Sequence, residues 1–77
     1  MLDRMGRLIR RGDRVTIGTR LEGIVVFSID TDEFSEEFPK ANWDYLGHGI
    51  MVQTDAAGLV HLPESDEDTL ILGQISN

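Results

Sequence analysis

The chain has 77 residues, a formal net charge of −7 and no cysteine. That length suits one small domain, and the absence of cysteine excludes disulfides, thiol nucleophiles and thiolate metal sites. The longest uninterrupted apolar run covers residues 24–27, which is far too short to span a membrane. Residues 1–11 are charged throughout and lack the apolar core of a secretion signal, so we expect a cytoplasmic protein with no membrane partner.

The charges divide the chain into a basic start and an acidic remainder. Residues 1–20 carry six arginines and two acids, a net charge of +4, whereas residues 21–77 carry one lysine and twelve acids, a net charge of −11. An acidic body repels nucleic acid and anionic membranes at long range. We therefore expect no nucleic acid on the body. The arginines of residues 1–20 could contact phosphate or the acidic body of a second copy. Alternatively, the basic start and the acidic remainder are both solvated surface.

We predict that residues 1–7 form a flexible basic N-terminal arm, because they have no helix N-cap and include a glycine. A single small β domain is expected over residues 8–77. Its first strand is predicted at residues 15–17, where apolar and polar side chains alternate. The second is predicted at residues 21–29, whose odd positions form one continuous buried face. Within this strand, Gly23 predicts a bend or a bulge.

A short helical element is predicted after the acidic loop of residues 30–40. It covers residues 39–46, because Pro39 suits the first turn of a helix and Gly47 suits its end. Trp43 then lies on the face that packs against the strands.

The clearest hairpin covers residues 50–62, which hold two alternating runs on either side of a small-residue turn. A three-residue loop over residues 56–58, with glycine last, pairs Asp55 with Leu59. This register places the apolar side chains of both strands on one face.

Five short strands, the last predicted at residues 69–75, and one short helical turn describe an all-β protein, a small five-stranded SH3-like barrel that is partly open. The pattern Gly12-Asp13-x-Val15-x-Ile17, followed by Gly23-x-Val25, resembles the opening of the KOW-type barrels of ribosomal and transcription proteins. This resemblance covers residues 10–29 and implies an SH3-like fold with nucleic-acid binding. The whole chain also resembles the short proteins that are common in bacterial genomes.

Four aromatic residues lie among acids within residues 31–46, and they are the candidate partner-binding residues: Phe34, Phe38, Trp43 and Tyr45. Exposed aromatic side chains amid acids suit a basic or proline-rich peptide. Alternatively, Trp43 and one phenylalanine cover the open end of the barrel. We predict a small non-catalytic binding module, a monomer or weak homodimer, that binds a protein partner through loop 31–46.

Two other functions stay open. In one, nucleic acid binds through the N-terminal arginines, Arg4, Arg7, Arg10 and Arg11. In the other, the acidic body imitates nucleic acid and occupies a basic site on another protein. No catalytic residue, metal or cofactor is predicted, because His48 and His61 belong to no catalytic motif and the acidic clusters lack the EF-hand pattern. We therefore do not expect an enzyme.

Overall fold

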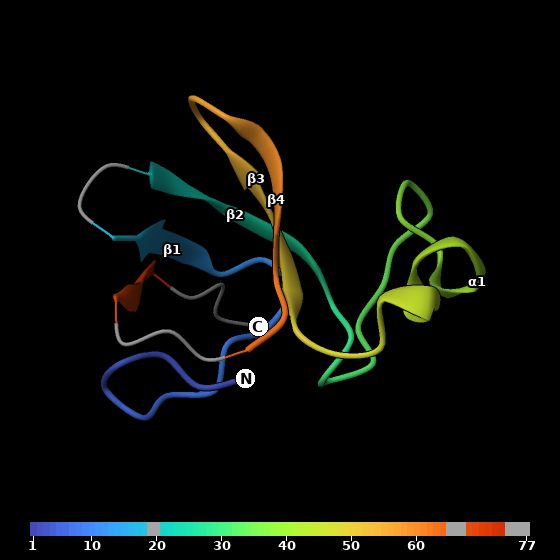
Figure 1. Cartoon of the computed structure of the whole chain (residues 1–77), viewed down its shortest axis with the longest axis horizontal. Helices are drawn as coiled ribbons and strands as arrows, with labels where there is room; N and C mark the ends of the chain where they lie inside the picture. The colour runs from blue at the N-terminus through green and yellow to red at the C-terminus, as the bar shows by residue number, and fades with distance from the viewer. Residues whose placement is uncertain (19–20, 65–67, 74–77) are drawn as a thin grey trace.

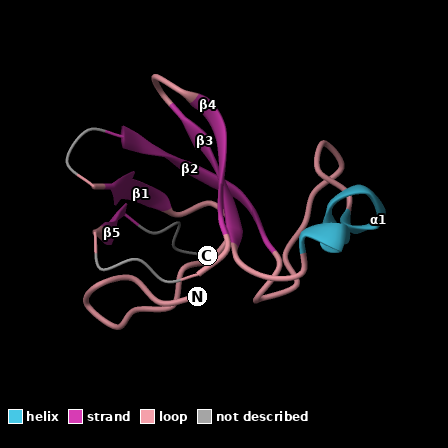
Figure 2. Ribbon diagram, in the orientation of Figure 1, coloured by secondary structure: helices cyan, strands magenta, loops and turns pink. Residues whose placement is uncertain are grey.

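The computed structural model describes residues 1–18, 21–64 and 68–73, and it shows five antiparallel strands in one sheet (Figure 1, Figure 2). In chain order the strands are β1 Arg14–Ile17, β2 Leu21–Ser28, β3 Ile50–Thr54, β4 Gly58–Leu62 and β5 Thr69–Gly73. A short helix, α1 Lys40–Trp43, and a 3₁₀ turn at Asp44–Leu46 connect β2 to β3. No helix in this described part of the chain is long and apolar enough to cross a membrane.

The strand order across the sheet is β4-β3-β2-β1-β5, so β4 and β5 form its two edges. The predicted all-β class, the five strands and the short helix are confirmed. The described strands form an open sheet and not a closed barrel. The SH3-like topology stays a prediction.

Strand β2 organises the sheet, because it pairs with β1 on one side and with β3 on the other. Its alternation is as predicted up to Phe27, since Gly23, Val25 and Phe27 are buried and Ile24 is exposed, but Ser28 is also fully buried. Side chains from the neighbouring elements complete one apolar core, which consists of Ile9, Val15, Val25, Ile50, Val52 and Ile71. Burial of such side chains stabilises a fold by roughly 25 cal/mol per Å² of apolar surface.

The irregularity in β2 lies at a different residue from the predicted one. The pairing of β2 with β3 shifts between Val25 and Phe27, so Val26 is the extra residue. Gly23 has another role, because a Cβ atom there would lie 2.2 Å from the carbonyl oxygen of Gln53. The prediction of a bulge at Gly23 is therefore wrong, and a bend there stays a prediction. The glycine permits the close approach of β2 and β3.

The helical element lies where the sequence predicts it. Pro39 is the N-cap of α1, with an extended backbone (φ −72°, ψ 145°). The 3₁₀ turn that follows ends at Gly47, whose φ of 88° favours glycine. The two residues that the sequence marks as helix start and helix end therefore bound the element.

The β3–β4 hairpin forms in a register that differs from the predicted one. Thr54 pairs with Gly58, whereas we predicted that Asp55 pairs with Leu59. The hydroxyl of Thr54 accepts a 2.9 Å hydrogen bond from the N–H of Ala57 and donates a 2.7 Å bond to the carbonyl of Gly58. These bonds close the loop directly after Thr54. Because the pairing moves by two residues, each face of the hairpin keeps its predicted side chains.

The N-terminal segment closes the β5 edge of the sheet. The Oδ2 atom of Asp3 accepts a 3.0 Å hydrogen bond from the N–H of Ile71, and Nη2 of Arg7 donates a 2.7 Å bond to the carbonyl of Ile71. The N–H of Arg4 also donates a 2.8 Å bond to the carbonyl of Thr69. These groups bind the backbone of β5 as a further strand would. The predicted extension of β5 over residues 74–75 lies outside the described residues.

The predicted boundary between an arm (residues 1–7) and a domain (residues 8–77) does not coincide with a gap in the packing. Leu2 and Leu8 form an isolated β-bridge, and Ile9 is fully buried in the core. The segment is thus a short hairpin that leads directly into the core. The flexibility of residues 1–7 in solution stays a prediction.

Asp3 is buried, and its carboxylate is surrounded by donors. Its Oδ1 atom accepts hydrogen bonds from the N–H groups of Met5 (3.0 Å) and Arg7 (2.9 Å), and its Oδ2 atom lies 2.9 Å from Nη2 of Arg7. Burial alone raises the pKa of a carboxyl group, but these bonds and the bond from Ile71 more than offset it. The pKa of Asp3 therefore lies below its ordinary value.

Gly23→Ala should lower the free energy of unfolding by about 3 kcal/mol, because its methyl group would overlap the backbone of β3. Gly73→Ala is the matched control, since no atom of the described residues lies within 4 Å of a Cβ atom placed there. Urea denaturation followed by circular dichroism measures both variants. Equal losses in the two variants would contradict the close approach of β2 and β3.

Asp3→Asn should destabilise the protein by about 2 kcal/mol at pH 7 and by much less in acid. The folded-state pKa of Asp3 lies below the unfolded value of ~3.9, so the carboxylate stabilises the fold above that value. Its contribution is lost as the pH falls through the folded-state pKa. Denaturation curves from pH 7 to pH 2 test this, with Glu36→Gln as an exposed control. A loss that does not change with pH would refute the role of the ionised carboxylate.

Candidate binding site

Three of the four predicted aromatic residues pack around one buried side chain. The ring centroid of Phe27, near the end of β2, lies 5.4 Å from that of Phe34, 5.8 Å from that of Phe38 and 5.4 Å from that of Trp43. Phe27 is fully buried and the other three are half-buried. We call these four residues the aromatic cluster. The structure gives its members a packing role, and their role in partner binding stays a prediction.

Tyr45 differs from the other predicted aromatic residues. It lies in the 3₁₀ turn with 74% of its surface exposed. Among the described residues, no aromatic ring stacks on it. The structure therefore separates Tyr45 from the aromatic cluster.

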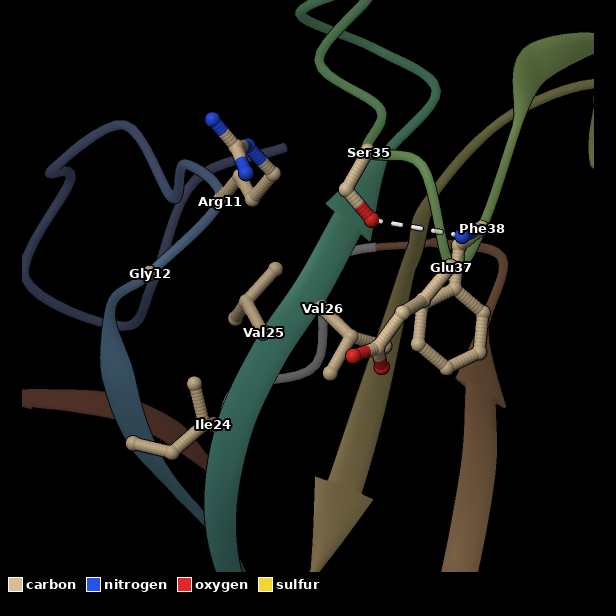
Figure 3. Close-up of a pocket in the computed structure, with 8 residues that line it drawn as sticks. All are labelled: Arg11, Gly12, Ile24, Val25, Val26, Ser35, Glu37 and Phe38. Atoms are coloured by element: carbon tan, nitrogen blue, oxygen red, sulfur yellow. Dashed lines mark hydrogen bonds between the residues drawn. The ribbon is translucent and has the colours of Figure 1, made fainter.

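An open pocket of about 220 Å³ lies beside the aromatic cluster. Three segments line it, namely the residues before β1, the middle of β2 and the loop after β2 (Figure 3): Arg11, Gly12, Ile24, Val25, Val26, Ser35, Glu37 and Phe38. The side chains from β2 are all apolar. Figure 3 shows Arg11 on one side of β2, and Glu37 and Phe38 on the other. The pocket thus combines an apolar surface with one cationic and one anionic side chain.

Backbone hydrogen bonds hold both walls of the pocket against β2. On one side, the N–H of Gly12 donates to the carbonyl of Val25 (2.8 Å), and the N–H of Val25 donates to the carbonyl of Asp13 (2.9 Å). Beyond the irregularity at Val26, Ser28 and Glu33 exchange two bonds of 2.9 Å. The segment before β1 and the loop after β2 therefore flank successive parts of the same strand.

The carboxylate of Glu33 connects the two walls. It accepts a 3.0 Å hydrogen bond from the guanidinium of Arg10 and a 3.4 Å bond from the N–H of Arg11. Partial burial raises the pKa of Glu33, but the bonds from Arg10 and Thr31 outweigh this effect, and its pKa lies below the ordinary value. In the same loop, Ser35 Oγ accepts a 3.2 Å bond from the N–H of Phe38, which shapes the turn that presents Phe38 (Figure 3).

Of the eight residues that line this pocket, sequence analysis named only Phe38 and Arg11 as candidates and missed six: Gly12, Ile24, Val25, Val26, Ser35 and Glu37. Ile24 and Val26 are apolar residues at even positions of β2, which the alternation places on the outward face. Apolar residues on an outward face were the signal in the sequence for a binding surface there. Glu37 had no signal of its own, because it resembles its neighbour Glu36. Arg11 was predicted only as a candidate nucleic-acid contact.

The four predicted arginines do not share one environment. Arg7 pairs with Asp3, and Arg10 pairs with Glu33. Arg4 and Arg11 form no ion pair with the described part of the chain. Two of the four cations are therefore already engaged with carboxylates of the same chain.

The histidines bind backbone carbonyls and do not line the pocket. Nδ1 of His48 lies 2.6 Å from the carbonyl oxygen of Pro63, and Nε2 of His61 lies 3.0 Å from the carbonyl oxygen of His48. Within residues 1–18, 21–64 and 68–73, no three histidine or acidic side chains come together as a metal site would require.

Trp43→Ala should lower the free energy of unfolding by about 3 kcal/mol, because the indole packs on Phe27 and Phe38. Tyr45→Ala should change it by less than ~0.5 kcal/mol, because Tyr45 is exposed. Urea denaturation followed by far-ultraviolet circular dichroism compares the two variants without relying on tryptophan fluorescence. A near-neutral effect of Trp43→Ala would return Trp43 to the list of exposed binding residues.

The pocket has to be interpreted from its own geometry. No family model, curated protein or solved structure matches this chain. The likeness of residues 10–29 to KOW-type barrels stays a resemblance.

Proposed function

We propose that this protein is a non-catalytic binding module that holds an extended, basic segment of a protein partner in the pocket beside β2. The observation that carries this proposal is the composition of the pocket. Phe38 and Glu37, from the predicted binding loop 31–46, lie beside Val26 of β2, and Ile24 lines the same pocket on the side of Gly12. An apolar surface with a few charged groups at its rim is the usual composition of a peptide-binding surface.

The apolar part of the pocket offers a place for one hydrophobic side chain. Ile24 is 37% exposed although it lies in the middle of the central strand. An apolar side chain that covers it gains roughly 25 cal/mol for each Å² of surface removed from water. The open shape of the pocket suits a side chain that projects from an extended segment.

The charges around the pocket favour a basic segment. The whole chain carries −7, and Glu36 and Glu37 are both exposed in the loop beside the pocket. Such a field attracts cationic partners at long range and speeds their association. Glu37 then pairs with a lysine or arginine of the segment, while Arg11 is placed to donate to its backbone carbonyls.

The two alternative functions have less support. Nucleic-acid binding through the N-terminal arginines is weakened by the ion pairs of Arg7 and Arg10. Imitation of nucleic acid rests on the acidic composition alone. The experiments below distinguish nucleic-acid binding from the proposed function.

A selection from a displayed library of random peptides tests the proposal. We expect enrichment of peptides with an apolar residue next to lysine or arginine, with weaker binding at high salt. Glu37→Lys should weaken these peptides about tenfold, because a pocket carboxylate becomes a cation. Glu36→Lys is the matched control, since it changes the net charge equally but does not line the pocket.

The apolar contact is tested separately. Ile24→Thr should weaken the selected peptides, whereas Leu72→Thr, at a residue 50% exposed on β5, should not. No enriched peptide, or equal effects in each matched pair, would overturn the proposal. Binding of RNA or DNA that survives Glu37→Lys and is lost in Arg4→Ala or Arg11→Ala would favour the nucleic-acid alternative.

A further inference from the structure

We propose that the free edge of β4 accepts an extended strand from a partner protein, added antiparallel and carrying basic residues at its N-terminal end. This surface lies outside the pocket, since no residue of β4 lines that pocket. The proposal therefore stands independently of the function proposed above.

The two edges of the sheet differ in whether other parts of the chain bind their backbone groups. At β5, Asp3 and Arg7 bind both backbone groups of Ile71, so that edge is occupied. At β4, within the described part of the chain, β3 is the only strand or helix in contact (Figure 1). A sheet edge that no other element covers presents unpaired N–H and C=O groups.

The direction of the backbone groups of β4 follows from the register. The N–H of Asp55, directly after β3, donates a 2.8 Å bond to the carbonyl of Glu22 in β2. Because these directions alternate along a strand, Gln53 and Met51 also point their backbone N–H and C=O groups toward β2. The other residues of β3 point their backbone groups toward β4, where they pair with Gly58, Val60 and Leu62. Leu59 and His61 therefore direct their N–H and C=O groups to the free edge.

Strand β4 carries none of the charged or proline residues that often protect an edge. Its sequence, GLVHL, contains no lysine, no acid and no proline. Leu59 is 43% exposed, so an incoming strand also finds an apolar side chain beside the backbone groups. Pro63 ends the available edge, and its carbonyl is already bound by His48. The edge thus offers a short, uncharged template of about five residues, the usual length for strand addition.

The charge of the chain decides between a second copy and a basic partner. Residues 41–77 contain no lysine or arginine, and four acids follow β4 almost directly in the sequence, namely Glu64, Asp66, Glu67 and Asp68. Antiparallel pairing of two β4 strands would bring together two chains that each carry a net charge of −7 and therefore repel each other. A partner strand with lysines at its N-terminal end instead lies beside the exposed Glu64, which follows Pro63 at the end of β4, and is attracted to it.

Amide hydrogen exchange measured by NMR tests the proposal on the full chain. The probe is a capped synthetic peptide, Lys-Lys-Val-Thr-Val-Thr-Val, and the control is the same peptide with two glutamates in place of the lysines. The lysine peptide should slow exchange of the amides of Leu59 and His61 about tenfold, and the glutamate peptide should not.

Two pairs of variants separate backbone pairing from charge. His61→Pro removes an outward N–H and should abolish the protection at Leu59, whereas His61→Ala keeps that N–H and should retain it. Leu59→Lys should weaken the lysine peptide, and Leu59→Glu should not. The Leu59 pair decides the matter if His61→Pro unfolds the protein.

Each outcome bears on the proposal. Absence of protection at millimolar peptide, or equal protection by both peptides, overturns it. Protection that appears without peptide and grows with protein concentration assigns the edge to a second copy and also overturns it. Shifts confined to the amides of Ile24 and Phe38 place the peptide in the pocket, which supports the function proposed above and refutes strand addition.

Discussion

The carboxylate of Asp3 is the interaction on which the arrangement of the sheet depends. It joins the N-terminal hairpin to Ile71, which is 68 residues away in the sequence. A buried carboxylate is costly unless its oxygens are fully hydrogen-bonded. Here backbone amides and a guanidinium donate hydrogen bonds to both oxygens. The buried charge therefore holds the N-terminal hairpin against Ile71 and does not destabilise the fold. Strand β5 is thereby held between β1 and the N-terminal hairpin, and Ile9 enters the core beside it.

The separation of charges along the sequence becomes a set of connections in the structure. Arg7 binds Asp3, Arg10 binds Glu33, and Arg14 binds both Glu22 and Asp55. Exposed ion pairs contribute little to stability, typically ~0.2–1 kcal/mol each. The pairs of Arg10 and Arg14 attach the basic start of the chain to particular places on the acidic body, whereas the pair of Arg7 with Asp3 lies within the start itself. The same pairing reduces the positive charge that a nucleic acid would need.

The sequence predicted those parts of the fold that depend on alternating side chains or on proline and glycine, whose backbone preferences are distinctive. The buried face of β2 and the helix between Pro39 and Gly47 are of this kind. The observed hairpin register comes with two local hydrogen bonds of the Thr54 hydroxyl, which the alternation of apolar side chains does not encode. Asp3 had no periodic signal, since a single polar residue near a terminus is usually solvated. In the pocket, aromatic character identified Phe38, but only the fold distinguishes the lining Glu37 from its neighbour Glu36.

The irregularity at Val26 divides the apolar interior into two parts. Val25 belongs to the core between the strands, whereas Phe27 carries the aromatic cluster under the loop, at the side of the molecule occupied by α1 (Figure 1). The aromatic part is the smaller, and the rings of Phe34 and Trp43 join the sheet through contact with Phe27. Cooperative units with fewer buried contacts open at lower free energy than the global transition. We therefore expect the wall of the pocket formed by the loop to open at lower free energy than the wall formed by the sheet, so that binding across both walls would couple their opening.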